Sequence, residues 1–255
     1  MPTTEADVSL VREIESALIT TWPALQTAVD GAWLVRMADG FTGRANSVTI
    51  LDPADDRDGE ARIAWAEGLF EAQNLVPCFR ETPLTPARVL QALRDAGYRE
   101  SGETHMLLGA LEVSNAGEDG ESTLTGYHLA HGSWMTAACA CSTRIAASAG
   151  IAGRMLANMA APVRYIAVSD KEGPAAVCQA GIHRDILALH NVATHPEKRR
   201  RGHAARAVAA AKAWGVLMGA KRLWIAVETG NAPALSLYRR DDLADIYRYR
   251  YWSRA

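Results

Sequence analysis

The segment 195–208, "HPEKRRRGHAARAV", contains four consecutive basic residues, 198–201, immediately before Gly202 and an alanine-rich run. The apolar stretch 186–194 before it predicts a strand, and the alanine-rich run predicts a helix from Gly202. Free N–H groups at a helix N-terminus bind phosphate, and glycine lets the backbone approach a ligand closely. Basic residues in a first helical turn oppose the helix dipole, and an anionic ligand relieves that conflict. The segment therefore predicts a phosphate site, with a solvated basic loop and a nucleic-acid patch as alternatives.

The whole chain argues against the nucleic-acid alternative. It has 255 residues and a formal net charge of −2, so the basic run is a local feature of a mildly acidic protein. The sequence contains no run of 18 apolar residues, and its N-terminus is acidic and amphipathic, unlike a secretory signal. The four cysteines form no C-x-x-C pair. We therefore expect a cytoplasmic protein with reduced thiols, no metal site, no membrane segment and no nucleic-acid partner.

A small, polar and acidic segment, "SNAGEDGES" (114–122), divides the chain into two predicted domains, 1–113 and 123–255. The first half predicts a helix over 5–29, a hairpin over 31–51, a helix over 60–72, a strand over 75–81, a helix over 86–95 and a strand over 103–113. The second half predicts a strand over 125–131, a helical region over 133–160, strands over 163–169, 175–184 and 186–194, a helix over 202–218, a strand over 222–228, a helix over 232–240 and a strand over 244–252. This order predicts a mixed α and β layer architecture.

The stretch "HNVATHPEKRRRGHAARAV" resembles motif A of the GNAT superfamily of acyl-CoA N-acyltransferases. Arg199, Gly202 and Ala204 fill its pattern, Arg/Gln-x-x-Gly-x-Gly/Ala, and the resemblance covers 124–252. It implies an α+β fold whose central sheet is mixed, mostly antiparallel and flanked by helices. "IAWAEGLFEAQNLVPCFRETP" and "ALRDAGYRESGETHMLL" look similar to degenerate GNAT-like halves of tandem members. The resemblance therefore implies a tandem of two GNAT-like halves, of which the first lacks a cofactor loop.

The resemblance also implies acetyl-CoA as co-substrate, without a metal. The backbone of 192–194 would pair with the pantetheine arm, and the amides of 200–205 would hold the pyrophosphate. Asn231 would lie beside the cofactor, although its position before "APA" also suits a helix N-cap. The chain departs from the family at Asp242 and Leu243, where the family usually has glycine and then phenylalanine or tyrosine. The implied cofactor-binding residues are Val192, Ala193, Thr194, Arg199, Arg200, Arg201, Gly202, His203, Ala204, Ala205 and Asn231.

Two side chains match positions that carry proton transfer in relatives. Tyr238 matches the tyrosine that protonates the departing thiolate, and packing of an aromatic ring is the alternative. His190 resembles the position of a catalytic histidine in serotonin acetyltransferases, and a hydrogen-bonded buried histidine is the alternative. Strand alternation predicts that His190 and Thr194 share one face. The weaker candidates for the base are His183, His195 and His203.

The sequence therefore predicts an N-acetyltransferase that transfers an acetyl group from acetyl-CoA to a primary amine of a small molecule or peptide. The alternative is a non-catalytic acyl-CoA-binding regulator. We expect a monomer or homodimer. The first half, including the polar "RANS" (44–47), is expected to cover the substrate side of the site.

Overall fold

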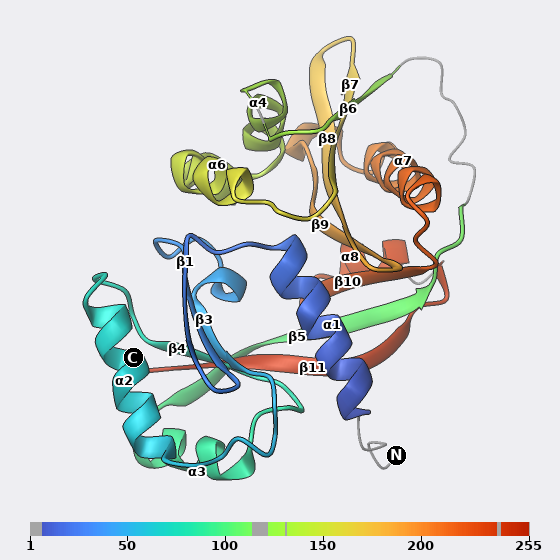
Figure 1. Ribbon diagram of the computed structural model, residues 1–255. Coiled ribbons are helices and arrows are strands. Elements are labelled where there is room, and N and C mark those ends of the chain that lie inside the picture. The colour runs from blue at the N-terminus through green and yellow to red at the C-terminus, as the bar shows by residue number, and fades with distance from the viewer. Residues whose placement is uncertain (1–6, 114–121, 131, 239–240, 255) are drawn as a thin grey trace.

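The computed structural model describes residues 7–113, 122–130, 132–238 and 241–254. All but the last residue of the predicted linker lie outside these ranges. A single sheet of eleven strands runs through the described residues, with helices on both of its faces (Figure 1). None of the described helices is long and apolar enough to cross a membrane.

The first half follows the predicted order, with one error near its N-terminus. Helix α1 begins after Asp7, whose carboxylate caps it, and ends before Trp22. Trp22 precedes Pro23, and the residue before a proline disfavours helical geometry. The helix predicted over 5–29 is therefore too long at its C-terminal end, where residues 26–30 form a strand instead. The elements are α1 (Val8–Thr21), β1 (Gln26–Asp30), β2 (Trp33–Met37), the short 3-10 helix η1 (Gly43–Ala45), β3 (Ser47–Ile50), α2 (Gly59–Glu71), β4 (Cys78–Glu81), α3 (Ala87–Asp95) and β5 (Arg99–Ala110).

The second half also follows the predicted order, and its helical region divides into three helices. Ser142 ends the first of these and caps the second through its side chain. The elements are β6 (Thr123–Tyr127), α4 (Gly132–Cys141), α5 (Thr143–Ala147), α6 (Ala149–Ala157), β7 (Val163–Asp170), β8 (Gly173–His183), β9 (Ile186–Thr194), the short 3-10 helix η2 (Pro196–Lys198), α7 (His203–Leu217), β10 (Arg222–Glu228), α8 (Ala232–Tyr238) and β11 (Ala244–Ser253).

The sheet repeats one pattern in each half and then exchanges the closing strands. Its order is β1-β2-β3-β4-β11-β5-β10-β9-β8-β7-β6. Strands β3 and β4 are parallel, as are β9 and β10, whereas the other neighbours are antiparallel. The last strand, β11, lies between β4 and β5 of the first half, and β5 in turn pairs with β10 of the second. The predicted division into two domains, 1–113 and 123–255, remains a proposal, because a single sheet contains strands from both.

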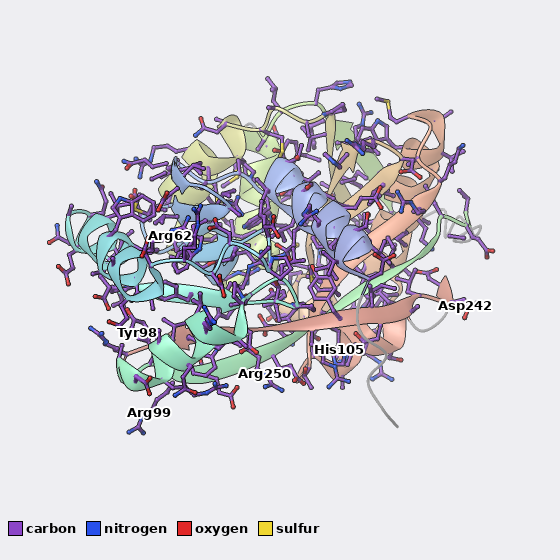
Figure 2. The ribbon with its side chains drawn as sticks, turned by 60° about the horizontal axis from the view of Figure 1, so that its bottom comes forward. Arg62, Tyr98, Arg99, His105, Asp242 and Arg250 are labelled. Carbon is purple, nitrogen blue, oxygen red and sulfur yellow. The ribbon has the colours of Figure 1, made fainter. Side chains whose placement is uncertain are left out.

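The helices cover the two faces of the sheet in separate groups. Helix α1 packs on β8, β9 and β11, beside α4 and α6. We call this the α1 face. The opposite face carries α7 and α8 over the second half, and α2 and α3 over the first. Between those two pairs of helices, β5 and β11 carry polar contacts such as the ion pair of Arg250 with Glu103 and the hydrogen bond between His105 and Asp245 (Figure 2). We call this second side the α7 face.

Candidate functional site

Strands β9 and β10 diverge at the end of their shared ladder. They pair only from Ile186 to Leu189 on β9 and from Arg222 to Ile225 on β10. Strand β10 then continues along β5, and β9 continues along β8. Within the described residues, no strand therefore lies along the β10 side of 192–194. This opening suits the predicted pairing of an extended ligand with the backbone of Val192, Ala193 and Thr194.

A β-bulge interrupts β9 inside the opening. Asn191 has a φ of 49°, and the pairing with β8 shifts by one residue between His190 and Ala193. Val192 consequently packs in the same cluster as Leu189, on the α7 face. The predicted common face of His190 and Thr194 is wrong, because the extra residue reverses the alternation.

The predicted phosphate turn lies directly after this strand. Gly202 has a φ of 82° and precedes the first residue of α7, and no side chain in the described part of the chain caps the helix. A methyl group added at Gly202 would meet no atom of the described residues within 4 Å, so within them the turn is open to a ligand. The side chains of Arg199, Arg200 and Arg201 are exposed beside it, whereas Ala204 and Ala205 keep the first helical turn small. Uncapped helical N–H groups, an open glycine and three exposed arginines together suit a diphosphate.

One member of the basic run points inward. Lys198 is 5% exposed, and its ammonium group donates to Asp170 and to the Gly173 carbonyl. Hydrogen bonding to Lys198 lowers the pKa of Asp170. The Nε2 atom of buried His203 lies 3.9 Å from the same carboxylate, and its Nδ1 has no partner among the described residues. Lys198 thus anchors the turn. The expected contribution of His203 to cofactor binding then depends on its backbone amide, because its side chain is buried.

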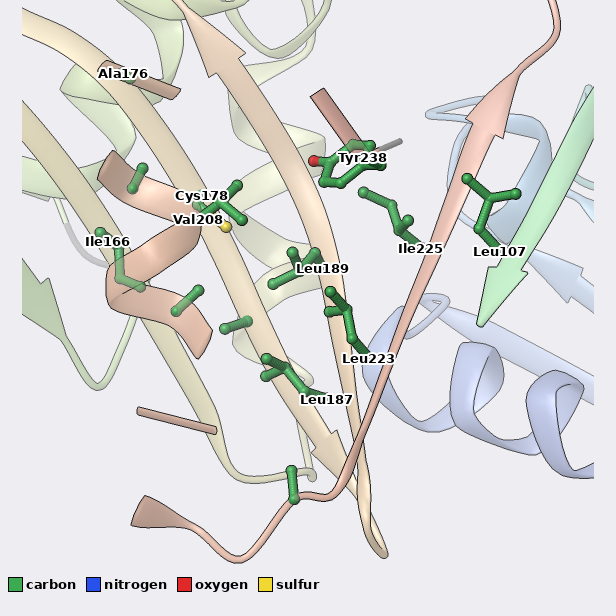
Figure 3. Close-up of a cluster of buried hydrophobic side chains, with 14 of the residues drawn as sticks. Leu107, Ile166, Ala176, Cys178, Leu187, Leu189, Val208, Leu223, Ile225 and Tyr238 are labelled. Atoms are coloured by element: carbon green, nitrogen blue, oxygen red, sulfur yellow. The ribbon is translucent and has the colours of Figure 1, made fainter. Parts of the chain in front are cut away.

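Tyr238 closes the opening on the α7 face. Its ring lies at the edge of the apolar cluster that includes Leu189 and Ile225 (Figure 3). The side chain is 2% exposed, and its hydroxyl has no hydrogen-bond partner in the part of the chain that the structure describes. Burial raises the pKa of Tyr238 well above 10, an effect that nearby Cys178 reinforces. The phenol therefore keeps its proton at neutral pH.

His190 occupies the opposite face, under the C-terminal end of α1. It is 2% exposed, and its ring centroid lies 5.1 Å from that of Trp22 and 5.4 Å from that of Trp224. Burial, aided by the charge of Arg44, lowers the pKa of His190 well below 6.5. The imidazole is therefore neutral near pH 7.

The hydrogen bonds of Thr21 define which nitrogen of His190 carries the proton. The Thr21 hydroxyl donates to the Ala17 carbonyl at 2.7 Å. Its oxygen also lies 2.9 Å from Nε2 of His190. Because a hydroxyl has one proton, the second contact requires that Nε2–H donates to Thr21. The lone pair is then on Nδ1, which has no partner in the described ranges and is free to accept a proton.

Several buried polar atoms near this opening have no hydrogen-bond partner among the residues that the structure describes. They include Nδ1 of His190, Oδ1 of Asn191, Nε1 of Trp224 and the Tyr238 hydroxyl. Most buried polar groups in proteins are hydrogen-bonded, so each exception calls for an explanation such as a ligand or bound water. The sequence did not single out Thr21, Trp22, Asn191 or Trp224, because nothing local marks them.

The other predicted residues lie around the opening or away from it. The Asn231 side chain is exposed and accepts the N–H of Ala234 at 3.2 Å, which confirms that it can cap α8. Nδ1 of His195 accepts the N–H of Glu197 at 3.4 Å, at the start of η2. His183 pairs with Ile186 at the far end of the β8–β9 hairpin and so lies away from the opening.

Two further features of the described residues concern the family pattern and metals. Asp242, where the family usually has glycine, adopts a φ of 49°. The backbone is therefore left-handed here although the residue is not glycine. No group of three or more histidine, cysteine or acidic side chains within the described ranges is placed to hold a metal ion.

Comparison with known proteins connects this geometry to a family. A family model described as "Probable histone acetyltransferase Rv0428c C-terminal" matches residues 8–252. The uncharacterized N-acetyltransferase YobR of Bacillus subtilis (strain 168) is 23% identical over 243 residues, which are 94% of this chain and 97% of that protein. A GCN5-related N-acetyltransferase from Kribbella flavida has a similar structure, with a TM-score of 0.68, 16% identity and 95% coverage of both chains. A tandem GNAT protein from the clavulanic acid biosynthesis pathway has a TM-score of 0.64 and 13% identity, over 94% of this chain and 86% of its own.

These matches confirm the predicted resemblance and the predicted fold class. The likeness to solved structures extends over nearly the whole chain, so both halves take part in it. Family membership supports an acyltransferase activity. The chain belongs to the probable histone acetyltransferase Rv0428c C-terminal family, within the GNAT superfamily of N-acetyltransferases.

Proposed function

We propose that the protein transfers an acetyl group from acetyl-CoA to a primary amine of a small molecule or peptide. The observation that carries the proposal is a set of buried polar atoms at the β9–β10 opening that have no partner within the described ranges, next to a start of α7 that no described side chain caps. The names of the relatives agree with this chemistry.

The α7 face has the features needed to hold the donor. Acetyl-CoA supplies an activated thioester. The backbone amides of 200–205 would hold its pyrophosphate, assisted by the exposed Arg199, Arg200 and Arg201. The open edge of 192–194 would hold the extended pantetheine arm. Tyr238 holds a proton on its hydroxyl at this face, where a departing thiolate needs one.

The α1 face has the features needed for the acceptor. Neutral His190 presents the lone pair of Nδ1 there, and a base is needed because only an unprotonated amine is nucleophilic. The proposed acid and the proposed base therefore lie on opposite faces of the sheet, with the opening between them. We propose that donor and acceptor enter from these two sides, and that the working form is a monomer or homodimer.

The test is a titration of the full chain with acetyl-CoA, followed by thioester consumption across a panel of amines. The acetylated product is identified by its mass. We expect saturable binding and turnover of at least one amine class, with no comparable affinity for an oligonucleotide. Binding without turnover of any amine would favour the regulator, and no binding would refute both functions.

A further inference from the structure

Two arginines lie on the α1 face beside one apolar cluster, which contains Trp22 and their chain neighbours Ala45 and Ile145. Arg44 lies in η1 of the first half, and Arg144 lies in α5 of the second half. The charge of Arg44 acts on Arg144, so the two guanidinium groups are within electrostatic range of each other. Each half of the chain thus contributes one arginine to this side of the sheet.

The backbone that carries Arg44 is held firmly. The buried Arg36 side chain donates to the Arg44 carbonyl at 2.9 Å. Gly43 lies directly against Tyr251, since a methyl group added there would sit 2.6 Å from the ring. The guanidinium of Arg44 stands 4.9 Å over the ring of Trp22. A stacked guanidinium keeps its hydrogen-bonding edge free for a ligand.

The pair stands beside the proposed base. Trp22 contacts both the Arg44 guanidinium and the His190 ring, at 4.9 and 5.1 Å from its own ring. Arg144 is also within range of Tyr249 and of Glu228, which ends β10 at the opening. Both arginines therefore lie on the side where the acceptor would enter.

Neither arginine has an acidic partner within the described residues. Elsewhere on this face Arg80 pairs with Glu15, and Arg154 pairs with Asp39. No ion pair joins Arg144 to Glu228, and the Arg44 guanidinium has its stacking contact with Trp22 but no ion pair with the described residues. Arg144 is an exposed residue, but partial desolvation of its guanidinium by neighbouring groups, followed by repulsion from Arg44, lowers its pKa. Two neighbouring arginines that have no acidic partner in the described ranges form a complementary site for an anion.

We propose that Arg44 and Arg144 bind a carboxylate or phosphate group on the acceptor, so that the substrate is an amine that also carries an anionic group. The proposal rests on the proposed function, because it assigns the acceptor to the α1 face. Planar guanidinium groups bind both anions through paired hydrogen bonds. Trp22 fixes the position of the anion relative to Nδ1 of His190, so the arginines also select which amine is presented to the base.

The experiment compares amines that differ only in the anionic group. The pairs are β-alanine and its amide, 6-aminohexanoate and its amide, O-phosphoethanolamine and ethanolamine, and a lysine tripeptide with a free or amidated C-terminus. They are assayed with the full chain and with Arg44→Gln, Arg144→Gln and Arg44→Lys. Arg99→Gln is the matched control, because Arg99 is an exposed arginine at the start of β5 (Figure 2). The readouts are kcat/KM, calorimetric affinity for each amine and for acetyl-CoA, and the melting temperature.

We expect the wild type to prefer the anionic member of at least one pair by roughly ten- to a hundredfold, the loss typical of a charge-assisted contact. Arg44→Gln and Arg144→Gln should remove that preference without changing the affinity for acetyl-CoA. Arg44→Lys should restore part of it, and Arg99→Gln should leave it intact. The phosphate pair and the carboxylate pairs distinguish the two anions.

Three results would overturn the proposal. They are equal use and equal binding of both members of every pair, a preference that survives both glutamine variants, and a loss of acetyl-CoA affinity with an unchanged preference. The last would assign the arginines to the donor and leave the proposed function intact. If no amine is turned over but the anionic members bind through Arg44 and Arg144, the anion site stands and the proposed function fails.

Discussion

The two ends of helix α7 provide a matched test of the phosphate turn. Gly202 precedes the helix with a φ of 82°, and Gly219 follows it with a φ of 85°. A methyl group added at either glycine would meet no atom within 4 Å. A substitution at either position therefore causes a similar backbone strain. Only Gly202 faces the predicted ligand. We expect Gly202→Val to abolish tight binding of acetyl-CoA and Gly219→Val to leave it unchanged.

Two quantities are expected to change: the stability of each variant and, for Gly202→Val, the affinity for acetyl-CoA. A non-glycine residue in the left-handed region costs about 1–2 kcal/mol, so each variant should melt roughly 2–8 °C below the wild type. The valine side chain at 202 would also occupy the surface that the pyrophosphate must approach. Loss of two charge-assisted hydrogen bonds, at about 1.5–3 kcal/mol each, corresponds to an affinity loss of at least roughly a hundredfold.

The assay is calorimetric titration with acetyl-CoA at a temperature well below both melting points. Thermal melts of the free proteins test whether the two variants are destabilised to the same extent. Undiminished affinity in Gly202→Val would refute the phosphate turn. An equal loss of affinity in Gly219→Val would show that binding responds to strain at any point of α7 and not to the turn.

Four further predictions follow from the structure. Tyr238→Phe should lower turnover by roughly ten- to a thousandfold in steady-state kinetics, with unchanged calorimetric affinity for acetyl-CoA; unchanged turnover would assign Tyr238 to packing. Thr21→Val should lower kcat by about tenfold because His190 loses its fixed tautomer, and Thr21→Ser should restore it; equal loss in both variants would contradict this role. Because burial lowers the pKa of His190, the unfolded state binds its proton first. The free energy of unfolding should therefore fall as the pH drops below about 6.5, by at most about 1.4 kcal/mol per pH unit, and denaturant titrations of His190→Gln should lack this contribution. A chain cut between residues 113 and 122 should give fragments that show no cooperative melting alone and regain acetyl-CoA binding when mixed, because β5 and β11 are exchanged; a C-terminal fragment that binds alone would refute this.

Most elements of the fold could be predicted because their signals are local. Helix α3 begins directly after Pro86, and the hairpin strands β2 and β3 lie within the stretch predicted for them. The partners of the closing strands could not be predicted, since alternation along β5 and β11 is the same whichever neighbour they have. The position of β11 depends on tertiary contacts. One is the buried network in which Glu15 on α1 binds both Arg80 on β4 and Tyr247 on β11.

The candidate site could be predicted where it depends on neighbouring residues in the chain. The glycine turn before α7 is of this kind, because Gly202 and the helix start are adjacent. The inward direction of Lys198 depends on Asp170, which lies on another strand. The position of His190 relative to Thr194 depends on the bulge at Asn191, which no pattern of apolar and polar residues reveals. The placement of Arg44 and Arg144 on the same side of the sheet depends on contacts between the two halves of the chain, which no local sequence pattern reveals.

The exchange of strands and the opening between β9 and β10 both affect how the donor and the acceptor reach the site. A transfer reaction needs separate access for donor and acceptor, and a continuous sheet blocks passage from one face to the other. Here the ladder stops after Leu189, and unpartnered atoms lie on both sides of the gap, with Tyr238 on the α7 face and His190 on the α1 face. Trp22 and Arg44, which belong to the first half, lie on the α1 face beside His190. Substitutions on the α7 face should therefore act on acetyl-CoA, whereas those of Trp22 and Arg44 should act on the amine. A first half without a phosphate turn would in this way contribute to catalysis through the choice of acceptor.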